Sequence, residues 1–339
     1  VAVVALEKPG PKPEYDEEHL RMLVLLAQAA APSAVVVESM DQLRRDNQRL
    51  RAAGGPSLTF VGDSPAMKSV DALLERAARA GMNVLITGET GAGKEIAARQ
   101  IHERSSRQGQ PFVILNCAAI PSELFEGQLF GHEKGSFTGA ERPSTGLWSE
   151  AHGGTFFLDE IGDLGLEHQA RILRTIEHGT FYRVGATQET HVDTLIIAAT
   201  NKDLLEAVKE GRFRRDLYHR LAAFEITLPP LREHLDDVPA LARHLLDLER
   251  HEAKYPVSGF TDAALAWLEG QPWPGNVREL RNCILRAIRL AQQPMIDVTD
   301  LIQASPMRRT AAAPQTGKVQ TLEEAEKQLI EDALNTANG

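Results

Sequence analysis

Apolar and polar positions along the middle of the chain follow the order expected for strands separated by helices. Short apolar stretches, partly β-branched, predict buried strands. These stretches are residues 83–87, 112–116, 153–158 and 194–201. Between them, apolar positions return every three or four residues, as they do on one face of a helix. This alternation favours a parallel sheet with helices on both faces, which is an α/β fold.

The α/β part, residues 56–232, is followed by a segment with helical periodicity alone. Residues 233–303 therefore predict a small helical subdomain. The composition of residues 304–320 is rich in Ala, Pro, Thr and Gln, which predicts a flexible linker. Residues 321–339 then predict one further helix, which a capping-box pattern opens.

The N-terminal part has its own pattern. The pattern of residues 1–31 predicts a strand and a helix. The pattern of residues 32–55 predicts a second helix, whose apolar positions alternate at spacings of four and three, with the polar Asn47 at one of them. Such a seam either pairs two subunits as a short coiled coil or packs on its own domain, and we favour pairing. The chain begins with Val1 rather than Met, so we expect a segment before it.

A glycine-rich segment directly follows the first central strand and precedes a helix. It consists of Gly88, Glu89, Thr90, Gly91, Ala92, Gly93, Lys94 and Glu95. Glycines let backbone N–H groups turn toward a polyphosphate, the helix start adds partial positive charge, and Lys94 supplies an ammonium group. The last position is usually Ser or Thr, a Mg²⁺ ligand. Because Glu95 stands there, a turn without a ligand remains an alternative on this segment alone.

Two carboxylates strengthen the nucleotide interpretation. Asp159 and Glu160 end the third predicted strand, where Asp159 can hold Mg²⁺ beside the phosphate loop and Glu160 can polarise a water. Asn116 and Asn201 end two other strands, at the edge where α/β sheets bind ligands. A turn or capping role is the alternative for each Asn. The two motifs together favour a nucleotide hydrolase.

Charge and composition limit the other functions. The chain has 339 residues, with 47 acidic and 37 basic side chains and a net charge of −10, which argues against a large nucleic-acid-binding face. No apolar run has the length of a membrane span and no secretory signal is present, so a cytoplasmic protein without a membrane partner is expected. Cys117 and Cys283 are far apart and form no CxxC pattern, which predicts buried reduced thiols.

Two further segments are unsuited to a core. Residues 129–140 are punctuated by glycine and carry Phe137, which predicts an exposed interaction loop. Residues 211–221 are dense in arginine. They form either a solvated surface helix or a source of arginines for a neighbour's γ-phosphate.

Together these segments resemble the AAA+ central domain of bacterial enhancer-binding proteins, the activators of sigma-54 RNA polymerase. The resemblance covers about residues 60–301. Residues 135–140 match the family's GAFTGA loop, and residues 213–218 and 275–280 match two further motifs. A Glu after the phosphate-loop Lys is common in that family, so Glu95 fits it.

The resemblance implies an ATP- and Mg²⁺-dependent site. The nucleotide contacts it implies are Val61, Gly62, the residues from Gly88 to Glu95, and Arg278 as second sensor. Lys94 would hold the phosphates, Asp159 the Mg²⁺, and Glu160 would activate water. Asn116 would be the switch that holds Glu160, and Asn201 the first sensor. Arg214 and Arg220 would be arginine fingers that act on a neighbouring subunit.

The resemblance also implies partners. The residues expected to contact sigma-54 RNA polymerase are Gly135, Ser136, Phe137, Thr138, Gly139 and Ala140, with Phe137 and Thr138 at the tip. Subunits would pair as resting dimers and form active hexameric or heptameric rings. Residues 321–339 resemble only the first helix of a Fis-like DNA-binding domain, so enhancer DNA would need a domain that is incomplete here. Residues 1–31 resemble the end of a GAF-like sensory domain.

The expected function is thus an ATP-hydrolysing activator that remodels the sigma-54 closed complex. A nucleotide-binding scaffold or repressor with lost turnover is the alternative. Ser136 replaces a usual Ala, and Leu195 stands where an Arg is usual, which is expected to weaken communication between subunits.

Overall fold

The structure is a computed structural model that describes residues 61–136, 143–253 and 255–305. The chain divides into two compact units, Val1–Leu58 and Thr59–Gly339, and every described residue belongs to the second. The predictions for residues 1–31 and 32–55, for the linker beyond residue 305 and for residues 321–339 lie outside the described part.

A five-stranded parallel sheet with the order β2-β3-β6-β1-β7 forms the centre of the α/β part. Its strands are β1 (Val84–Thr87), β2 (Phe112–Asn116), β3 (Thr155–Asp159), β6 (Leu195–Thr200) and β7 (Phe224–Thr227). The first four confirm the predicted strands. β7 was missed because it alternates polar with apolar residues, which leaves Ile226 as its buried position.

The register places the strand ends that carry polar residues side by side. Val84 of β1 pairs with Ile197 of β6 and with Phe224 of β7. At the carboxyl edge Asn116 of β2 pairs with Asp159 of β3. The polar residues that follow β1, β2, β3 and β6 therefore meet along one edge of the sheet, as expected for parallel strands.

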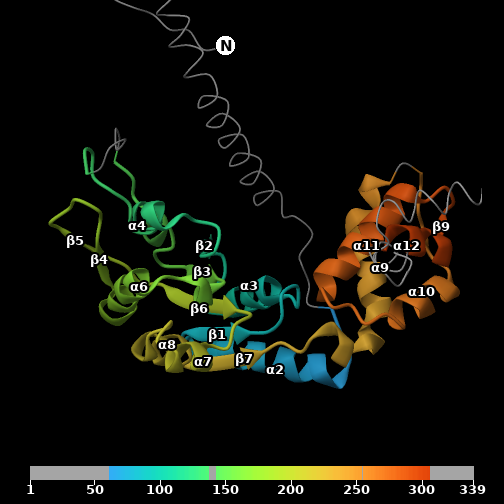
Figure 1. The fold of residues 1–339 in the computed structure, drawn as a ribbon, viewed down its shortest axis with the longest axis horizontal. Helices are drawn as coiled ribbons and strands as arrows, with labels where there is room; N and C mark the ends of the chain where they lie inside the picture. Colours follow the sequence, from blue (N-terminus) through green and yellow to red (C-terminus); the bar gives the residue numbers. More distant parts are fainter. Residues whose placement is uncertain (1–60, 137–142, 254, 306–339) are drawn as a thin grey trace, which may run out of the picture. The chain divides into compact units, whose positions relative to one another are not determined.

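Helices cover both faces of the sheet, and the alternation of side chains along each strand divides the core in two (Figure 1). The helices are α2 (Pro65–Ala80), α3 (Lys94–Arg104), α4 (Ser122–Phe130), α5 (Leu147–Glu150), α6 (Leu166–His178), α7 (Leu204–Lys209) and α8 (Arg215–Leu221). Val84, Ile86 and Phe157 pack with α2 and α3, whereas Leu85 and Phe156 pack with the other helices.

Helix α2 starts at a Ser-Pro pair, and both residues are ones that this position favours. The Ser64 hydroxyl accepts a hydrogen bond from the N–H of Met67, and Pro65 is the first helical residue. The short antiparallel hairpin of β4 (Thr180–Tyr182) and β5 (Glu189–His191) was not predicted. Its strands are too short for a sequence pattern to identify.

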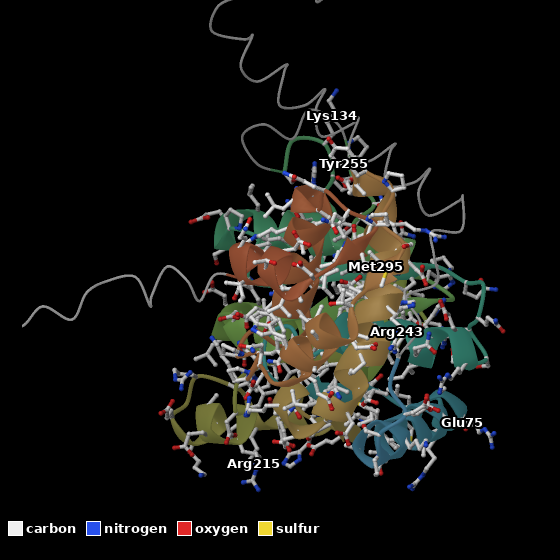
Figure 2. The ribbon with its side chains drawn as sticks, turned by 90° about the vertical axis from the view of Figure 1, so that its right-hand side faces the viewer. Glu75, Lys134, Arg215, Arg243, Tyr255 and Met295 are labelled. Carbon is white, nitrogen blue, oxygen red and sulfur yellow. The ribbon has the colours of Figure 1, made fainter. Side chains whose placement is uncertain are left out.

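The second part is a helical subdomain with its own apolar core. It contains α9 (Val238–Glu249), α10 (Asp262–Glu269), α11 (Asn276–Leu290) and α12 (Val298–Ala304), with the short pair β8 (Gly259–Phe260) and β9 (Met295–Ile296). Tyr255 and Met295 lie exposed on its surface (Figure 2). Short 3₁₀ turns η2 (Leu231–Glu233) and η3 (Leu235–Asp237) lead into it from β7, and η4 (Arg250–Glu252) follows α9. The predicted fold class, an α/β domain with a parallel sheet followed by a helical lid, is confirmed.

The sequence predicts a helix that starts with Asn276 at the N-cap and Glu279 three residues later, and this start was wrong in detail. Gly275, not Asn276, is the N-cap of α11, and Asn276 is its first helical residue with a fully buried side chain. Glu279 does accept a hydrogen bond from the N–H of Gly275, at 2.8 Å. Asn276 cannot cap the helix because other partners occupy its side chain, as described below.

Cys117 and Cys283 are free and buried, as predicted. Within the part of the chain that the structure describes, every helix is too short or too polar to cross a membrane.

Candidate functional site

The glycine-rich loop connects β1 to α3 and lets the backbone turn back toward the helix start. Gly93 adopts the left-handed conformation as N-cap of α3, with φ 98°. Gly91 has φ 81°, and a Cβ atom there would lie 2.4 Å from the carbonyl oxygen of Gly275. Only glycine fits at Gly91, since a side chain would collide with the start of α11. The loop thus directs the amides that begin α3 toward an anion.

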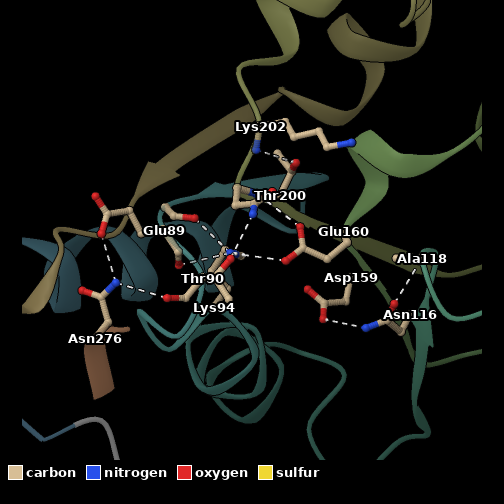
Figure 3. A network of polar contacts seen from close by, with 12 residues as sticks. Glu89, Thr90, Lys94, Asn116, Ala118, Asp159, Glu160, Thr200, Lys202 and Asn276 are labelled. Atoms are coloured by element: carbon tan, nitrogen blue, oxygen red, sulfur yellow. Dashed lines mark hydrogen bonds and ion pairs between the residues drawn. The ribbon is translucent and has the colours of Figure 1, made fainter. Parts of the chain in front are cut away.

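Lys94 lies inside this loop and is 6% exposed. Its ammonium donates hydrogen bonds to the carbonyl oxygens of Gly88, at 2.9 Å, and Glu89, at 3.3 Å (Figure 3). It also lies 3.8 Å from Glu160 Oε1. Burial lowers the pKa of Lys94, while the charges of Glu160 and Asp159 act in the opposite direction. The side chain is therefore held where phosphate oxygens would meet it.

Asp159 and Glu160 diverge at the end of β3. Asp159 is the last strand residue, while Glu160 has φ 52° and starts the 3₁₀ turn η1 (Ile161–Asp163). This left-handed backbone is unusual for Glu and turns its side chain away from that of its neighbour. Burial and the Glu160 charge raise the pKa of Asp159. The two carboxylates thus face different partners.

Asn116 contacts the first carboxylate rather than the second. Its Nδ2 donates to Asp159 Oδ2 at 3.4 Å, and its Oδ1 accepts from the N–H of Ala118 at 3.0 Å. The expected hold of Asn116 on Glu160 is therefore absent from the described contacts. The register explains the difference, because Asn116 lies directly opposite Asp159.

Asn201 joins the phosphate loop to Glu160. Its Nδ2 donates to the Thr90 hydroxyl at 2.9 Å, and its backbone N–H donates to Glu160 Oε2 at 3.3 Å. Residues from β1, β3 and β6 therefore converge, as the positions of the strand ends suggested. The sequence placed Asn201 at this edge but gave no sign of its bond to Thr90.

Both glutamates of the loop direct their carboxylates elsewhere. Glu95 forms an ion pair with Arg99 on α3, at 2.8 Å, and is half exposed. Arg232 donates to both carboxylate oxygens of Glu89, at 2.7 and 2.8 Å, and Asn276 donates to one of them at 3.0 Å. Neither side chain meets Lys94 or Asp159 in these contacts, so only the backbones of Glu89 and Glu95 belong to the anion-binding part of the loop.

The segment that contains Val61 and Gly62 is fixed by a residue that the sequence did not reveal. Asp237 accepts hydrogen bonds from the N–H groups of Asp63, at 2.7 Å, and Ser64, at 2.9 Å, and its other oxygen lies 3.1 Å from His234 Nδ1. Burial alone would raise the pKa of Asp237, but these hydrogen bonds outweigh it and lower the pKa.

Gly62 is required beside this carboxylate, and Val61 packs on the core of the lid. A Cβ at Gly62 would lie 2.9 Å from both Asp237 Oδ2 and Met67 Cγ. Val61 contacts the apolar cluster that α9 to α12 enclose. The two residues thus lie where the α/β part meets the lid, as a contact for a nucleotide base would require.

A cavity of about 610 Å³ lies between the phosphate loop and α11. Thr90 and Asn201 line it from the α/β part, and Arg278 and Arg286 line it from α11. Arg278, the expected second sensor, therefore faces the same space as the expected first sensor. The volume falls in the range of small-molecule sites.

The two expected arginine fingers lie on the surface. Arg214 forms an ion pair with Asp216 at 2.7 Å, and Arg220 contacts Glu177 at 3.4 Å. No described contact joins either arginine to the site of its own chain. The hydrogen bonds that Arg214 donates to Asp216 raise the pKa of Arg214 still further, so its charge is permanent.

The expected partner loop is described at its flanks only. Gly135 and Ser136 are described, whereas Phe137, Thr138, Gly139 and Ala140 lie outside the described residues. The flanks are held by paired hydrogen bonds between the backbones of His132 and Ser144, at 3.0 and 2.9 Å. Leu195 is buried in the core of its own chain, so it presents no surface to a neighbouring subunit.

Comparison with known proteins agrees with this geometry. Residues 60–227 match the model of the sigma-54 interaction domain, and residues 232–318 match that of the AAA+ ATPase lid domain. The transcriptional regulatory protein ZraR from Klebsiella oxytoca is 45% identical over 281 residues, which cover 83% of this chain and 63% of ZraR. The DNA-binding transcriptional regulator NtrC from Rhizobium meliloti (strain 1021) is 40% identical over 285 residues, which cover 82% of this chain and 59% of NtrC. This chain thus spans less than two thirds of either relative.

Solved structures give the same result. NtrX from Brucella abortus in complex with ADP superposes with a TM-score of 0.69 at 35% identity, over 93% of this chain and 69% of that chain. Its complex with ATP gives 0.68 at 33% identity, over 89% and 64%. The match of both domains, in sequence and in fold, shows that this chain belongs to the family of AAA+ proteins with a sigma-54 interaction domain.

Proposed function

We propose that this chain hydrolyses ATP in a ring of identical subunits and uses the turnover to remodel the closed complex of sigma-54 RNA polymerase. The observation that supports this most is the convergence of Lys94, Asp159, Glu160 and Asn201 at the phosphate loop. A loop that served only as a turn would have no need of two carboxylates and a buried ammonium at this edge.

The nucleotide would lie along the loop with its phosphates at Lys94. The loop amides and the start of α3 bind phosphate oxygens, and Lys94 exchanges its two carbonyl partners for them. Arg278 lines the cavity and would meet the terminal phosphate across it. Val61 and Gly62 would contact the nucleobase. NtrX has been solved with ADP and with ATP, which supports nucleotide binding at the corresponding site here.

Asp159 fits a Mg²⁺ ion. It is a partly buried carboxylate whose pKa is raised by burial and by the charge of Glu160, so a nearby cation would offset an excess of negative charge. Among the described residues there is no cluster of three or more His, Cys, Asp or Glu side chains that could hold a metal. One carboxylate suffices for Mg²⁺, which takes its other ligands from phosphates and water. The ion would neutralise charge that develops on the phosphates.

Glu160 would orient and deprotonate the attacking water. Its two carboxylate oxygens are fixed by separate partners, Lys94 on one side and the backbone of Asn201 on the other. A base that is held in this way keeps its direction toward the γ-phosphate, which is where positioning contributes most to phosphoryl transfer. Asn201, bonded to Thr90, would sense the γ-phosphate through the same contacts.

A neighbouring subunit would complete the site. Arg214 and Arg220 are 43% and 55% exposed and do not reach the site of their own chain. An arginine that approaches from outside would stabilise charge on the γ-phosphate in the transition state. This requires a ring, which we infer to be hexameric or heptameric and to assemble from dimers.

The partner loop, residues 135–140, would transmit the conformational change that ATP hydrolysis causes to sigma-54. Residues 135–140 follow β2 and α4 in the chain, and Asn116 at the end of β2 already contacts Asp159. In this proposal Asn116 would pass a change of charge at the γ-phosphate on to the loop. In the cell we place the protein in the cytoplasm, with enhancer DNA bound through a domain beyond the described residues.

The test is ATP hydrolysis as a function of protein concentration for the unchanged chain, Arg214→Ala and the matched control Arg212→Ala. Arg212 is an exposed arginine two positions away, paired with Glu210. We expect activity that rises cooperatively with concentration, falls at least about 10³-fold in Arg214→Ala and persists in Arg212→Ala. In the presence of ADP and aluminium fluoride, the unchanged chain should form a stable complex with sigma-54.

Other outcomes would point elsewhere. Nucleotide binding without turnover at any concentration would favour a scaffold or repressor. Turnover that is independent of concentration and unaffected by Arg214→Ala would refute a site completed by a neighbour.

A further inference from the structure

The phosphate loop touches the lid directly, backbone to backbone. A Cβ at Gly91 would lie 2.4 Å from the carbonyl oxygen of Gly275 and 2.9 Å from Arg278 Cβ. No side chain separates the loop from the first turn of α11. A movement of the lid must therefore displace the loop, unless this contact breaks.

Asn276 reinforces the contact with hydrogen bonds to two segments, the phosphate loop and the 3₁₀ turn η2. Its side chain is fully buried, and its Nδ2 donates to Glu89 Oε2, at 3.0 Å, and to the carbonyl oxygen of Thr90, at 3.1 Å. Its Oδ1 accepts from the N–H of Leu231 at 2.8 Å (Figure 3 shows the bonds to the loop). The side-chain amide of Asn276 thus joins the phosphate loop, η2 and α11. The backbone of Asn276 has an unusual φ of 54°.

Arg232 in η2 binds the carboxylate of Glu89. Its two terminal nitrogens donate to the two carboxylate oxygens in parallel, which is the strongest geometry for this pair. Hydrogen bonds from Arg232 and Asn276 lower the pKa of Glu89 to about 2, so the carboxylate is ionised at any working pH. Glu89 also lines the cavity that Arg278 and Asn201 face. The negative charge of Glu89 therefore lies at the edge of the cavity in which the phosphates of the proposed nucleotide would bind.

We propose that Glu89, Arg232 and Asn276 form a clamp, in which Glu89 is a positioning residue that links the phosphate loop to the lid and Arg232 neutralises the charge that would otherwise repel the nucleotide. The proposal rests on the proposed function, since it concerns the same nucleotide. The proposal gives Arg232 and Asn276 a role that the sequence did not indicate. The sequence predicted that Glu89 contacts the nucleotide, whereas here its side chain connects the phosphate loop to the lid.

The clamp predicts an unusual pattern among variants. Arg232→Ala leaves the Glu89 charge unpaired beside the phosphates, so we expect affinity for a fluorescent ADP analogue (mant-ADP) to fall at least about five-fold. Glu89→Gln keeps an acceptor for Asn276 but removes the charge. The double variant Glu89→Gln/Arg232→Ala should therefore bind more tightly than Arg232→Ala alone and return to within about two-fold of Glu89→Gln.

Arg289→Ala is the matched control. Arg289 forms an ion pair with Glu252 at 2.9 Å within the lid, and its exposure of 54% is close to the 48% of Arg232. Its loss should leave affinity for mant-ADP within about two-fold, because neither Arg289 nor Glu252 lines the cavity. Thermal unfolding of each variant checks that it is folded.

The outcomes separate the two proposals. Failure of the unchanged chain to bind mant-ADP would refute the proposed function and the clamp with it. Normal binding by the unchanged chain, combined with Arg232→Ala within two-fold of it, would refute the clamp alone. A double variant weaker than Arg232→Ala would also refute it, because the two side chains would then act separately. Recovery of affinity in the double variant is a result that a purely structural pair would not give.

Discussion

Replacing Asp237 with Ala should cost more stability than any surface change in this chain. Asp237 is 3% exposed, and its carboxylate accepts two backbone hydrogen bonds, from Asp63 and Ser64, and contacts His234. The variant would leave two N–H groups and a buried imidazole without this partner. The carboxylate also connects η3, at the start of the lid, to the N-cap of α2.

The size of the effect follows from these contacts. Removing one partner from a buried, hydrogen-bonded charged group costs about 3 to 5 kcal/mol. For a unit of this size the midpoint of thermal unfolding falls by about 2 to 4 °C per kcal/mol, so a drop of roughly 6 to 20 °C is expected. Asp237→Asn keeps a neutral acceptor for the backbone N–H groups and should lose only about 1 kcal/mol.

The pH dependence gives a second test. The folded-state pKa of Asp237 lies below its ordinary value. Its contribution to stability is therefore fully present above the unfolded-state pKa, about 4, and is lost as the pH falls through the folded-state value. The stability gap between the unchanged chain and Asp237→Ala should be constant from pH 6 to 8 and should narrow below pH 4.

Calorimetry of the unchanged chain, Asp237→Ala and Asp237→Asn at pH 7 and at pH 3.5 would measure both effects. A loss below about 1 kcal/mol in Asp237→Ala would refute the reasoning, because surface substitutions cost that little. So would an Asn variant that is as unstable as the Ala variant, since the backbone contacts would then be irrelevant.

Three further substitutions or reactions test other parts. Ser136→Ala should raise the free energy of unfolding by about 1 kcal/mol, because the Ser136 hydroxyl is buried and has no hydrogen-bond partner among the described residues. Urea unfolding would measure this change, and a variant less stable than the unchanged chain would contradict the prediction. Gly91→Ala should abolish binding of mant-ADP, because its Cβ would collide with the start of α11, whereas Gly211→Ala, equally strained at φ 71° but in open space, should bind normally. Equal affinities of these two variants would argue against the collision. Burial raises the pKa of Cys117, and it raises the pKa of Cys283 to about 11. At pH 8 both thiols should therefore react with Ellman's reagent about 100-fold more slowly in the native protein than in urea. Equal rates in the native and unfolded protein would exclude such burial.

The sheet was largely predictable because each central strand is apolar on both sides. Such strands stand out in the sequence, whereas edge strand β7, with exposed Glu225 and Thr227, does not. The phosphate loop and the Asp159–Glu160 pair were predictable for a similar reason, since their chemistry depends on residues that are close in sequence.

The remaining parts of the site depend on contacts between distant segments. Asp237 meets Ser64, and Asn276 meets Glu89, through pairings that no local pattern contains. Asn276 illustrates the limit well. The spacing to Glu279 predicted a helix cap, but tertiary contacts took over its side chain and left the cap to Gly275. Local propensity was overridden there because a buried amide must satisfy all its polar atoms.

The position of β1 between β6 and β7 has a consequence for synthesis of the protein. The strand that carries the phosphate loop is made early, yet Val84 pairs with Ile197 and Phe224, which leave the ribosome much later. Until then both edges of β1 lack their native neighbours, and pairing over such separations is slow. Until β6 and β7 have been made, the apolar strand β1 therefore lacks both of its partners, and an unpaired apolar strand is prone to aggregation. Truncation before Leu195 would leave both edges of β1 unpaired, and truncation between Thr200 and Phe224 would leave one edge unpaired.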